Sequence, residues 1–298
     1  MQSKNKIEQA IKELDYTPNE LSRNLFFKRS GIVAVLVPYI SHPFYAEFCH
    51  RVEDELYLEG YKTMVCNTAG DHKSEAEYLE MLNRHIVDGI ITAVHTLDVE
   101  AYIATEKPIV AMDRYLSDNI PIVSVDHYKG GEIAAKHMIE CGCTKALQFQ
   151  GALSVPSPAH ERHIAFSQVM RENGITVYTK ELSHNKFDDN YFKEVVREVF
   201  DQYPYIDGVF GADMLSIQFM IEAMRHGKKV PDDINIIAYD GTYITDLTYP
   251  KMTAIVQPID KLAYECVRLL IARINNMECE EQVRIDVGFV QGDSTRIK

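Results

Sequence analysis

The fold is decided by GIVAVLVPYISHPFYAEFCHRVEDELYLEGYKTMVCN, residues 31–67. An almost wholly apolar run, 31–37, is followed by an amphipathic stretch of helical length, 43–59, and by a second short run, 61–67. Strands that are apolar at nearly every position are typical of a parallel sheet covered on both faces. A helix is the usual connection between two parallel strands. The stretch therefore predicts a strand–helix–strand unit.

The same alternation continues to the end of the chain. Apolar strands separated by helices indicate the doubly wound α/β class. The number of predicted strands is larger than a single twisted sheet usually holds. We therefore predict an α/β fold of two Rossmann-like doubly wound lobes with parallel sheets. The further predicted strands are 89–94, 108–112, 122–125, 145–150, 176–182, 208–212, 234–239 and 253–257.

The chain is predicted to cross between the lobes three times. The first crossing is VSVDHYKGGE (123–132), where Asp126 is expected to cap a helix and a long helix to begin at about Ile133. Two more crossings are expected near 256–258 and 286–288. The predicted core, 31–298, then consists of an N-terminal lobe (31–126 plus 257–287) and a C-terminal lobe (127–256 plus 288–298).

Residues 1–30 have a different character. The segment 5–15 is typical of an amphipathic helix, and Thr17, Pro18 and Glu20 form a capping box that opens a second, short helix. Residues 1–30 hold six Lys or Arg against four acidic residues, whereas the whole chain has a net charge of −13. Any contact with nucleic acid is therefore expected to be confined to this segment.

Composition and motifs narrow the function classes. The chain has no long apolar run typical of a membrane span and no visible secretory signal, so we predict a cytoplasmic protein without membrane contact. The six cysteines lack zinc or dithiol spacing, which favours reduced, mostly buried thiols. The patterns GxGxxG, GxxxxGKS/T, GxSxG and HExxH are absent. We therefore predict no catalytic residue, no metal and no cofactor.

The segment YTPNELSRNLFFKRSGIVAVLVPYISHPFYAEFCHRVEDELYLEGYKTMVCNT (16–68) closely resembles the lactose/galactose-repressor (LacI/GalR) family of bacterial transcription regulators. In that family a helix-turn-helix headpiece ends in GYxPNxxAR, continues into a hinge helix and leads to a strand followed by SNPFF. YDGT, 239–242, is most similar to the sucrose-operon repressor branch. The resemblance continues through MDR (112–114), VDHYKGG (125–131), ERHIAF (161–166) and YPKMTAIVQP (249–258).

The resemblance implies the periplasmic-binding-protein-like sensor of a repressor. A sugar or sugar phosphate would bind between the lobes and control operator DNA binding by a homodimer through allostery. The first two headpiece helices, which include the recognition helix, would precede Met1. We interpret residues 1–30 as the remnant of the headpiece with its hinge helix, and the chain as a shortened regulator.

Two other function classes stay open at this point. A transport-type sugar-binding receptor without DNA binding would have the same two-lobed fold, but it would need a secretory signal and would give the capped hinge segment no purpose. A doubly wound enzyme is less favoured because the catalytic patterns are absent. His42, His127, His160 and His163 form no catalytic pattern in sequence, although they could still lie close together in space.

Ligand contacts are expected at the carboxyl ends of the strands. Phe44 and Tyr45 would pack on the apolar face of a sugar beside a hydrogen bond from Ser41; alternatively they form a hydrophobic staple at the start of a helix. Arg162 matches the family pattern RxxGF and would present two donors to adjacent hydroxyls. Its alternative role is a surface salt bridge with Glu161.

Four further ligand residues are expected from the strand ends. Asp240 would accept hydrogen bonds from sugar hydroxyls, or else cap the turn before Gly241. Asp113 would bind ligand or pair with Arg114. The other two are Asp213 and Gln257, which lies at the second crossing. In the family an Asn or Ser often precedes the Asp that corresponds to Asp213, whereas here Ala212 stands in that place.

The resemblance also implies contacts between the hinge helix and DNA. Leu25 would wedge into a base step in the minor groove, and Arg23 and Lys28 would face phosphates. Asn19 and Ser22 complete the expected DNA-binding residues. Without DNA, Leu25 and its neighbours would instead pack on the core.

Overall fold

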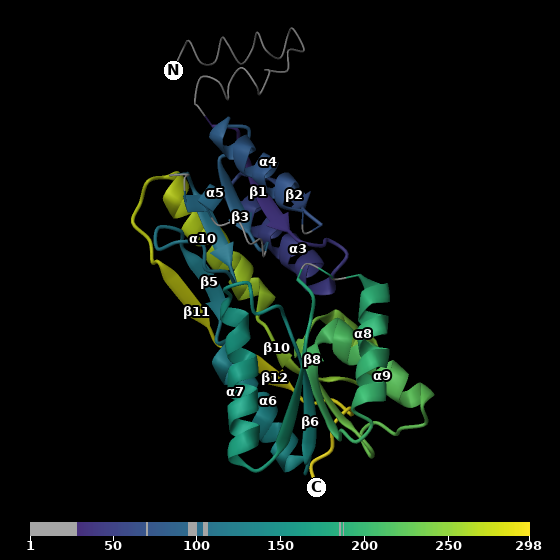
Figure 1. Cartoon of the computed structure of the whole chain (residues 1–298). Helices are drawn as coiled ribbons and strands as arrows, with labels where there is room; N and C mark the ends of the chain where they lie inside the picture. Colours follow the sequence, from purple (N-terminus) through teal and green to yellow (C-terminus); the bar gives the residue numbers. More distant parts are fainter. Residues whose placement is uncertain (1–28, 70, 95–99, 104–106, 185, 187) are drawn as a thin grey trace, which may run out of the picture.

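The apolar run at 31–37 forms strand β1 (Ile32–Val37), which is buried from Val33 onward on both faces. In this computed structural model, which describes residues 29–69, 71–94, 100–103, 107–184, 186 and 188–298, β1 lies inside the sheet of the N-terminal lobe (Figure 1). The predicted hinge residues Asn19, Ser22, Arg23, Leu25 and Lys28 lie outside the described residues.

The N-terminal lobe is one parallel sheet with helices on both faces. Its strand order is β11-β5-β4-β3-β1-β2. Helices α3 and α10 share a core on one face of the sheet, and α4 packs with Tyr102 of α5 on the other. The further elements are β2 (Lys62–Asn67), β3 (Gly89–Thr92), β4 (Ile109–Met112), β5 (Ile122–Val125), β11 (Gln282–Ile285), α3 (Pro43–Leu58), α4 (His72–Asn83), α5 (Glu100–Ile103) and α10 (Ile259–Ile274).

The C-terminal lobe repeats this arrangement. Its strand order is β12-β10-β9-β8-β6-β7, with α6 and α7 on one face and α8 and α9 on the other. Its elements are β6 (Lys145–Gln150), β7 (Thr176–Glu181), β8 (Gly208–Ala212), β9 (Asn235–Asp240), β10 (Thr253–Val256), β12 (Gly288–Val290), α6 (His127–Glu140), α7 (Glu161–Glu172), α8 (Asp189–Gln202), α9 (Asp213–Arg225) and the 3-10 helices η1 (Pro158–His160) and η2 (Tyr243–Leu247).

Every strand predicted from the sequence is present, and the two-lobed α/β prediction is confirmed. The sheets are not wholly parallel, because the edge strand β12 pairs antiparallel with β10. Strands β11 and β12 were not predicted as strands. Their residues are intermediate or exposed and lack a buried apolar run.

The chain leaves one sheet for the other after β5, β10 and β11, which supports the lobe boundaries that we propose. At the first crossing the helix begins at His127 rather than near Ile133. The carboxylate of Asp126 accepts a hydrogen bond from Lys129 N at 2.9 Å, so the predicted cap is confirmed and the helix starts there.

Two glycines of the YKGG segment allow α6 to approach its neighbours closely. A Cβ on Gly130 would lie 2.7 Å from the Tyr239 hydroxyl, and one on Gly131 would lie 2.1 Å from the carbonyl oxygen of Arg162. The glycines therefore set the position of α7 and of the side chains at its start. The six cysteines are free and five are buried, as the sequence indicated.

Candidate functional site between the lobes

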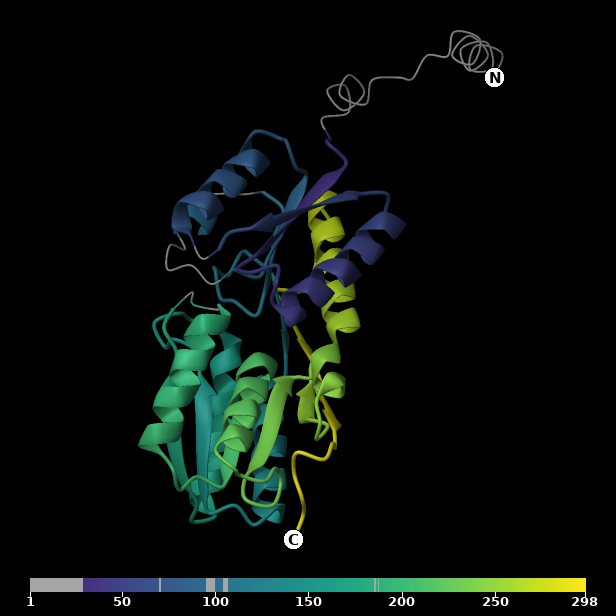
Figure 2. The same cartoon turned by 90° about the vertical axis from the view of Figure 1, so that its right-hand side faces the viewer.

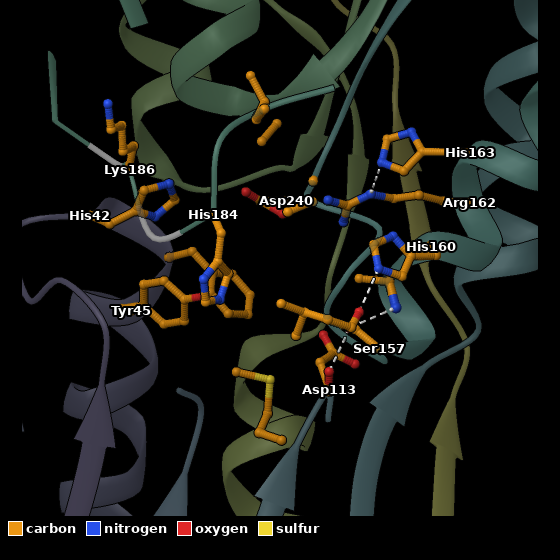
Figure 3. Close-up of a pocket in the computed structure, with 18 of the residues that line it drawn as sticks. His42, Tyr45, Asp113, Ser157, His160, Arg162, His163, His184, Lys186 and Asp240 are labelled. Atoms are coloured by element: carbon orange, nitrogen blue, oxygen red, sulfur yellow. Dashed lines mark hydrogen bonds between the residues drawn. The ribbon is translucent and has the colours of Figure 1, made fainter. Parts of the chain in front are cut away.

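A cavity of about 170 Å³ lies between the lobes, at the carboxyl ends of strands from both sheets. Ligands of open α/β sheets bind in this position. Side chains that follow β1, β4, β7, β9 and β10 converge on it, together with the start of α7 (Figure 3). Of the predicted ligand residues, the cavity is lined by Phe44, Tyr45, Asp113, Arg162, Asp240 and Gln257.

The N-terminal lobe contributes an aromatic wall. Phe44 and Tyr45 lie in the first turn of α3, with Pro43 at its start, and their rings meet edge to face at a centroid distance of 5.4 Å. Both side chains are buried. Ser41 is exposed and does not line the cavity.

Arg162 enters the cavity from the start of α7. Its guanidinium carbon lies 4.3 Å from the centroid of the Tyr239 ring, and its Nε donates to His163 Nε2 at 3.2 Å. Glu161, its alternative partner, instead forms an ion pair with Arg284 of the other lobe at 2.8 Å. Stacking and the hydrogen bond hold the planar guanidinium in one orientation.

Asp240 ends β9 with a φ of 121°. Its Oδ1 accepts a hydrogen bond from Gln257 Nε2 at 2.8 Å, and burial raises the pKa of its carboxyl to about 6. The Oε1 atom of Gln257 is buried and has no hydrogen-bond partner among the described residues. A ligand hydroxyl would satisfy this acceptor.

Asp113 directly follows β4 and has a φ of 54°. Its carboxylate lies 2.9 Å from His127 Nε2, and Nδ1 of the same ring lies 2.9 Å from the Tyr239 hydroxyl. Arg114, the alternative partner, donates to the Val94 carbonyl oxygen and lies 4.0 Å from the Glu75 carboxylate. The Ser157 hydroxyl of the opposite lobe donates to the Asp113 carbonyl oxygen at 2.7 Å, so Asp113 lies where the lobes meet.

Asp213 has a different environment from the one predicted. Its buried carboxylate accepts hydrogen bonds from Gly241 N, Thr242 N and the Thr242 hydroxyl at 2.7–3.1 Å. Burial, followed by the charge of Asp240, raises the pKa of its carboxyl to about 8. Asp213 does not line the cavity, whereas Ala212 does. Its contacts hold the turn that follows Asp240.

Sequence patterns did not predict the histidines of this cavity. His42, His160, His163 and His184 line it, with Lys186 beside them (Figure 3). Burial lowers the pKa of His42 to about 4 and that of His163 well below its usual value, so both are neutral at pH 7. His42 precedes α3, His160 and His163 lie in η1 and α7, and His184 and Lys186 follow β7, so no single spacing along the chain connects them.

The cavity therefore offers carboxylate and amide acceptors, one oriented guanidinium and a wall of aromatic rings. This combination suits a small molecule with several hydroxyl groups and an apolar face. No group of three or more potential metal ligands occurs in the described part of the chain. None of the helices among the same residues is long and apolar enough to cross a membrane.

Residues 135–295 match the periplasmic binding protein-like domain family. The chain is 36% identical to the sucrose operon repressor of Streptococcus mutans over 97% of this chain and 89% of the relative. It is 34% identical to the ribose operon repressor of Halalkalibacterium halodurans over 89% and 80%. The chain belongs to the LacI/GalR family of transcription regulators.

Solved structures of this family have the same fold. A periplasmic binding protein/LacI transcriptional regulator from Alkaliphilus metalliredigens, complexed with D-xylulofuranose, superposes with a TM-score of 0.79 at 30% identity. It covers 90% of this chain and 100% of that one. A LacI family regulator from Enterococcus faecium with bound ribose gives a TM-score of 0.77 at 27% identity, covering 90% and 99%.

Proposed function

We propose that this protein is a sugar-responsive transcription repressor whose interlobe cavity binds the sugar or sugar phosphate effector. The observation that carries the proposal is the cluster of Arg162, Asp240 and Gln257. Their oriented donors and acceptors face the aromatic rings of the other lobe across the cavity. The cavity volume of about 170 Å³ is below the range of about 300–1,000 Å³ for drug-sized ligands, so we expect a monosaccharide-sized effector.

The relatives support this proposal. Sucrose and ribose operon repressors align with 89% or more of the chain. The structures from Alkaliphilus metalliredigens and Enterococcus faecium were solved with D-xylulofuranose and ribose, respectively. We extend to this chain the control of an operon and the binding of a small sugar.

A connection between the cavity and the proposed DNA-binding segment supports allosteric control. Helix α10 begins two residues after Gln257 and runs to the end of the N-terminal lobe from which residues 29–31 emerge (Figure 2). There Arg29 donates to Asn275 Oδ1 at 2.9 Å, and Asp88 accepts hydrogen bonds from Ser30 N and Gly31 N. An effector that binds two lobe arrangements with different affinity would shift the equilibrium between them. The shift would move the point where residues 29–31 are held by these hydrogen bonds, and it would thereby change operator binding by a homodimer.

A thermal-shift screen of D-ribose, D-fructose, sucrose and their phosphates tests the effector site. A ligand at 100 times its Kd stabilises the folded state by about 2.7 kcal/mol, which raises the Tm of a domain of this size by about 5–10 °C. We expect Arg162→Ala to abolish most of this rise. The control Arg225→Ala removes an exposed arginine that pairs with Glu222 of its own helix, and it should retain the full rise.

Equal stabilisation of the wild type and Arg162→Ala would show that Arg162 is not part of the ligand site. Control of operator binding is tested separately, on the full-length protein. Its affinity for operator DNA, measured with and without the best ligand, should then differ by at least about fivefold. An unchanged operator affinity would reject the repressor proposal even if the sugar binds.

A further inference from the structure

A second hollow lies in the C-terminal lobe, between α7 and the strands β6 and β7. This polar groove has a volume of about 540 Å³ and is lined by Gln148, Gln150, His163, Ile164, Ser167, Gln168, Arg171, Glu172 and Thr179. A helix that covers a sheet normally buries apolar side chains against it. Here most of the facing side chains are polar.

The strand side of the groove follows the two-residue period of a sheet. Ala146 and Val177 are paired across β6 and β7 and pack in the apolar core beneath α6 and α7. The next pair on the same face is Gln148 with Thr179, and Gln150 follows. The face thus changes from apolar to polar toward the carboxyl ends of the strands, where α/β proteins bind ligands.

The helix side follows the four-residue period of α7. His163, Ser167 and Arg171 are spaced four residues apart, so they share one side of the helix, and all three line the polar groove. Gln148 Nε2 connects the two sides because it donates to the hydroxyls of Ser167 at 2.8 Å and Thr179 at 3.0 Å.

Two buried polar atoms at the polar groove lack a hydrogen-bond partner among the described residues. They are Gln148 Oε1 and His163 Nδ1, on side chains whose residues are only 2% and 3% exposed. His163 Nε2 accepts from Arg162, so in the neutral ring the proton is on Nδ1. The groove therefore offers an unused acceptor and an unused donor, and leaving such buried groups unpaired is destabilising.

We propose that the polar groove is a second binding site, for a small neutral molecule with several hydroxyl groups such as a polyol or monosaccharide. A hydroxyl both donates and accepts, so one such molecule can satisfy Gln148 Oε1 and His163 Nδ1. An anion is disfavoured because only Arg171 carries a positive charge at the lining, and Glu172 lies beside it. Binding here does not depend on the effector role proposed for the interlobe cavity.

Nuclear magnetic resonance of the chain labelled with 15N-histidine tests this site. We expect His163 to show the proton on Nδ1, and its Nδ1 signal to move saturably as xylitol is added. Gln148→Leu removes the unused acceptor and should abolish the saturable change. A change that persists in Gln148→Leu would arise from the interlobe cavity, which His163 also lines, and would overturn the proposal.

A matched pair on β7 provides a second test that does not alter a buried residue. Thr179→Val removes a hydroxyl from the polar groove, whereas Thr176→Val removes one from the exposed start of the same strand. We expect Thr179→Val to weaken xylitol binding at least fivefold and Thr176→Val to leave it unchanged. No saturable response in the wild type, or equal affinity in both variants, would reject the site, whatever the interlobe cavity binds.

Discussion

Asp113 and Asp240 both occupy backbone conformations that L-residues rarely adopt, with φ values of 54° and 121°. Such conformations cost about 1–3 kcal/mol each and collect at ligand sites, where the surrounding structure holds them. Here the bond of Asp113 to His127 and that of Asp240 to Gln257 hold the two carboxylates. The sequence indicated both as ligand residues from their places at strand ends, but the His127 link requires three-dimensional proximity and could not be predicted.

The carboxyl of Asp240 predicts a pH dependence of effector binding. Burial raises its pKa to about 6, and ligand hydroxyls donate more strongly to its ionised form, which accepts at both oxygens. Affinity should therefore be constant above about pH 7 and fall as the pH decreases through 6, by about tenfold at pH 5. Calorimetric titration between pH 5 and 8 measures this profile.

The matched variant for this prediction is Asp240→Asn, which retains an acceptor oxygen but cannot ionise. It should bind more weakly at pH 7.5 and lose most of the pH dependence between 5 and 7. The histidines of the cavity are the same in both proteins, so the difference between the two profiles reports the Asp240 carboxyl together with Asp213, whose pKa the Asp240 charge raises. Parallel profiles would assign the pH dependence to another group.

At the scale of elements, the position of α7 depends on α6. The sequence predicted that the YKGG segment would lie at a lobe crossing, but not why it needs two glycines. The structure gives the reason: Gly130 approaches the Tyr239 hydroxyl, and Gly131 approaches the backbone of Arg162. The long apolar strands could be predicted because an apolar run in the sequence indicates a buried strand. The short strands β11 and β12 could not, because they form by pairing with strands that are distant in sequence.

Gly131→Ala should therefore damage both stability and binding. The added methyl group would overlap the Arg162 carbonyl oxygen at 2.1 Å, so α6 and α7 must separate. We expect a loss of about 1–3 kcal/mol in the free energy of unfolding and a weaker effector affinity, because Arg162 moves with α7. Denaturant unfolding and calorimetry measure the two effects.

Gly288→Ala is the control for this change. A Cβ at Gly288 would lie 3.5 Å from Val256 Cβ, an ordinary contact, so its stability and affinity should stay close to those of the wild type. If Gly131→Ala were as stable and bound effector as tightly as Gly288→Ala, the close approach of α6 to α7 would not position Arg162.

At the scale of the whole molecule, the homodimer that we propose needs an exposed apolar surface. One lies on η2 and the residues after it, where Tyr243, Leu247 and Tyr249 are 59%, 76% and 90% exposed. Helix α9, which packs against η2, adds Ile221 and Met224. Large apolar side chains exposed together on packed elements are typical of an interaction site, and we propose that a second copy of the chain covers them.

Leu247→Glu tests this assignment because a charge buried in an apolar interface is costly. We expect the dimer Kd to rise at least tenfold, which corresponds to about 1.4 kcal/mol or more. Tyr205→Glu places the same charge at an equally exposed residue, 77%, on the loop between α8 and β8, and the dimer should be retained. Sedimentation equilibrium of the three proteins distinguishes the outcomes. Equal dimer Kd values would show that the copies meet on another face, and a monomeric wild type would reject the homodimer.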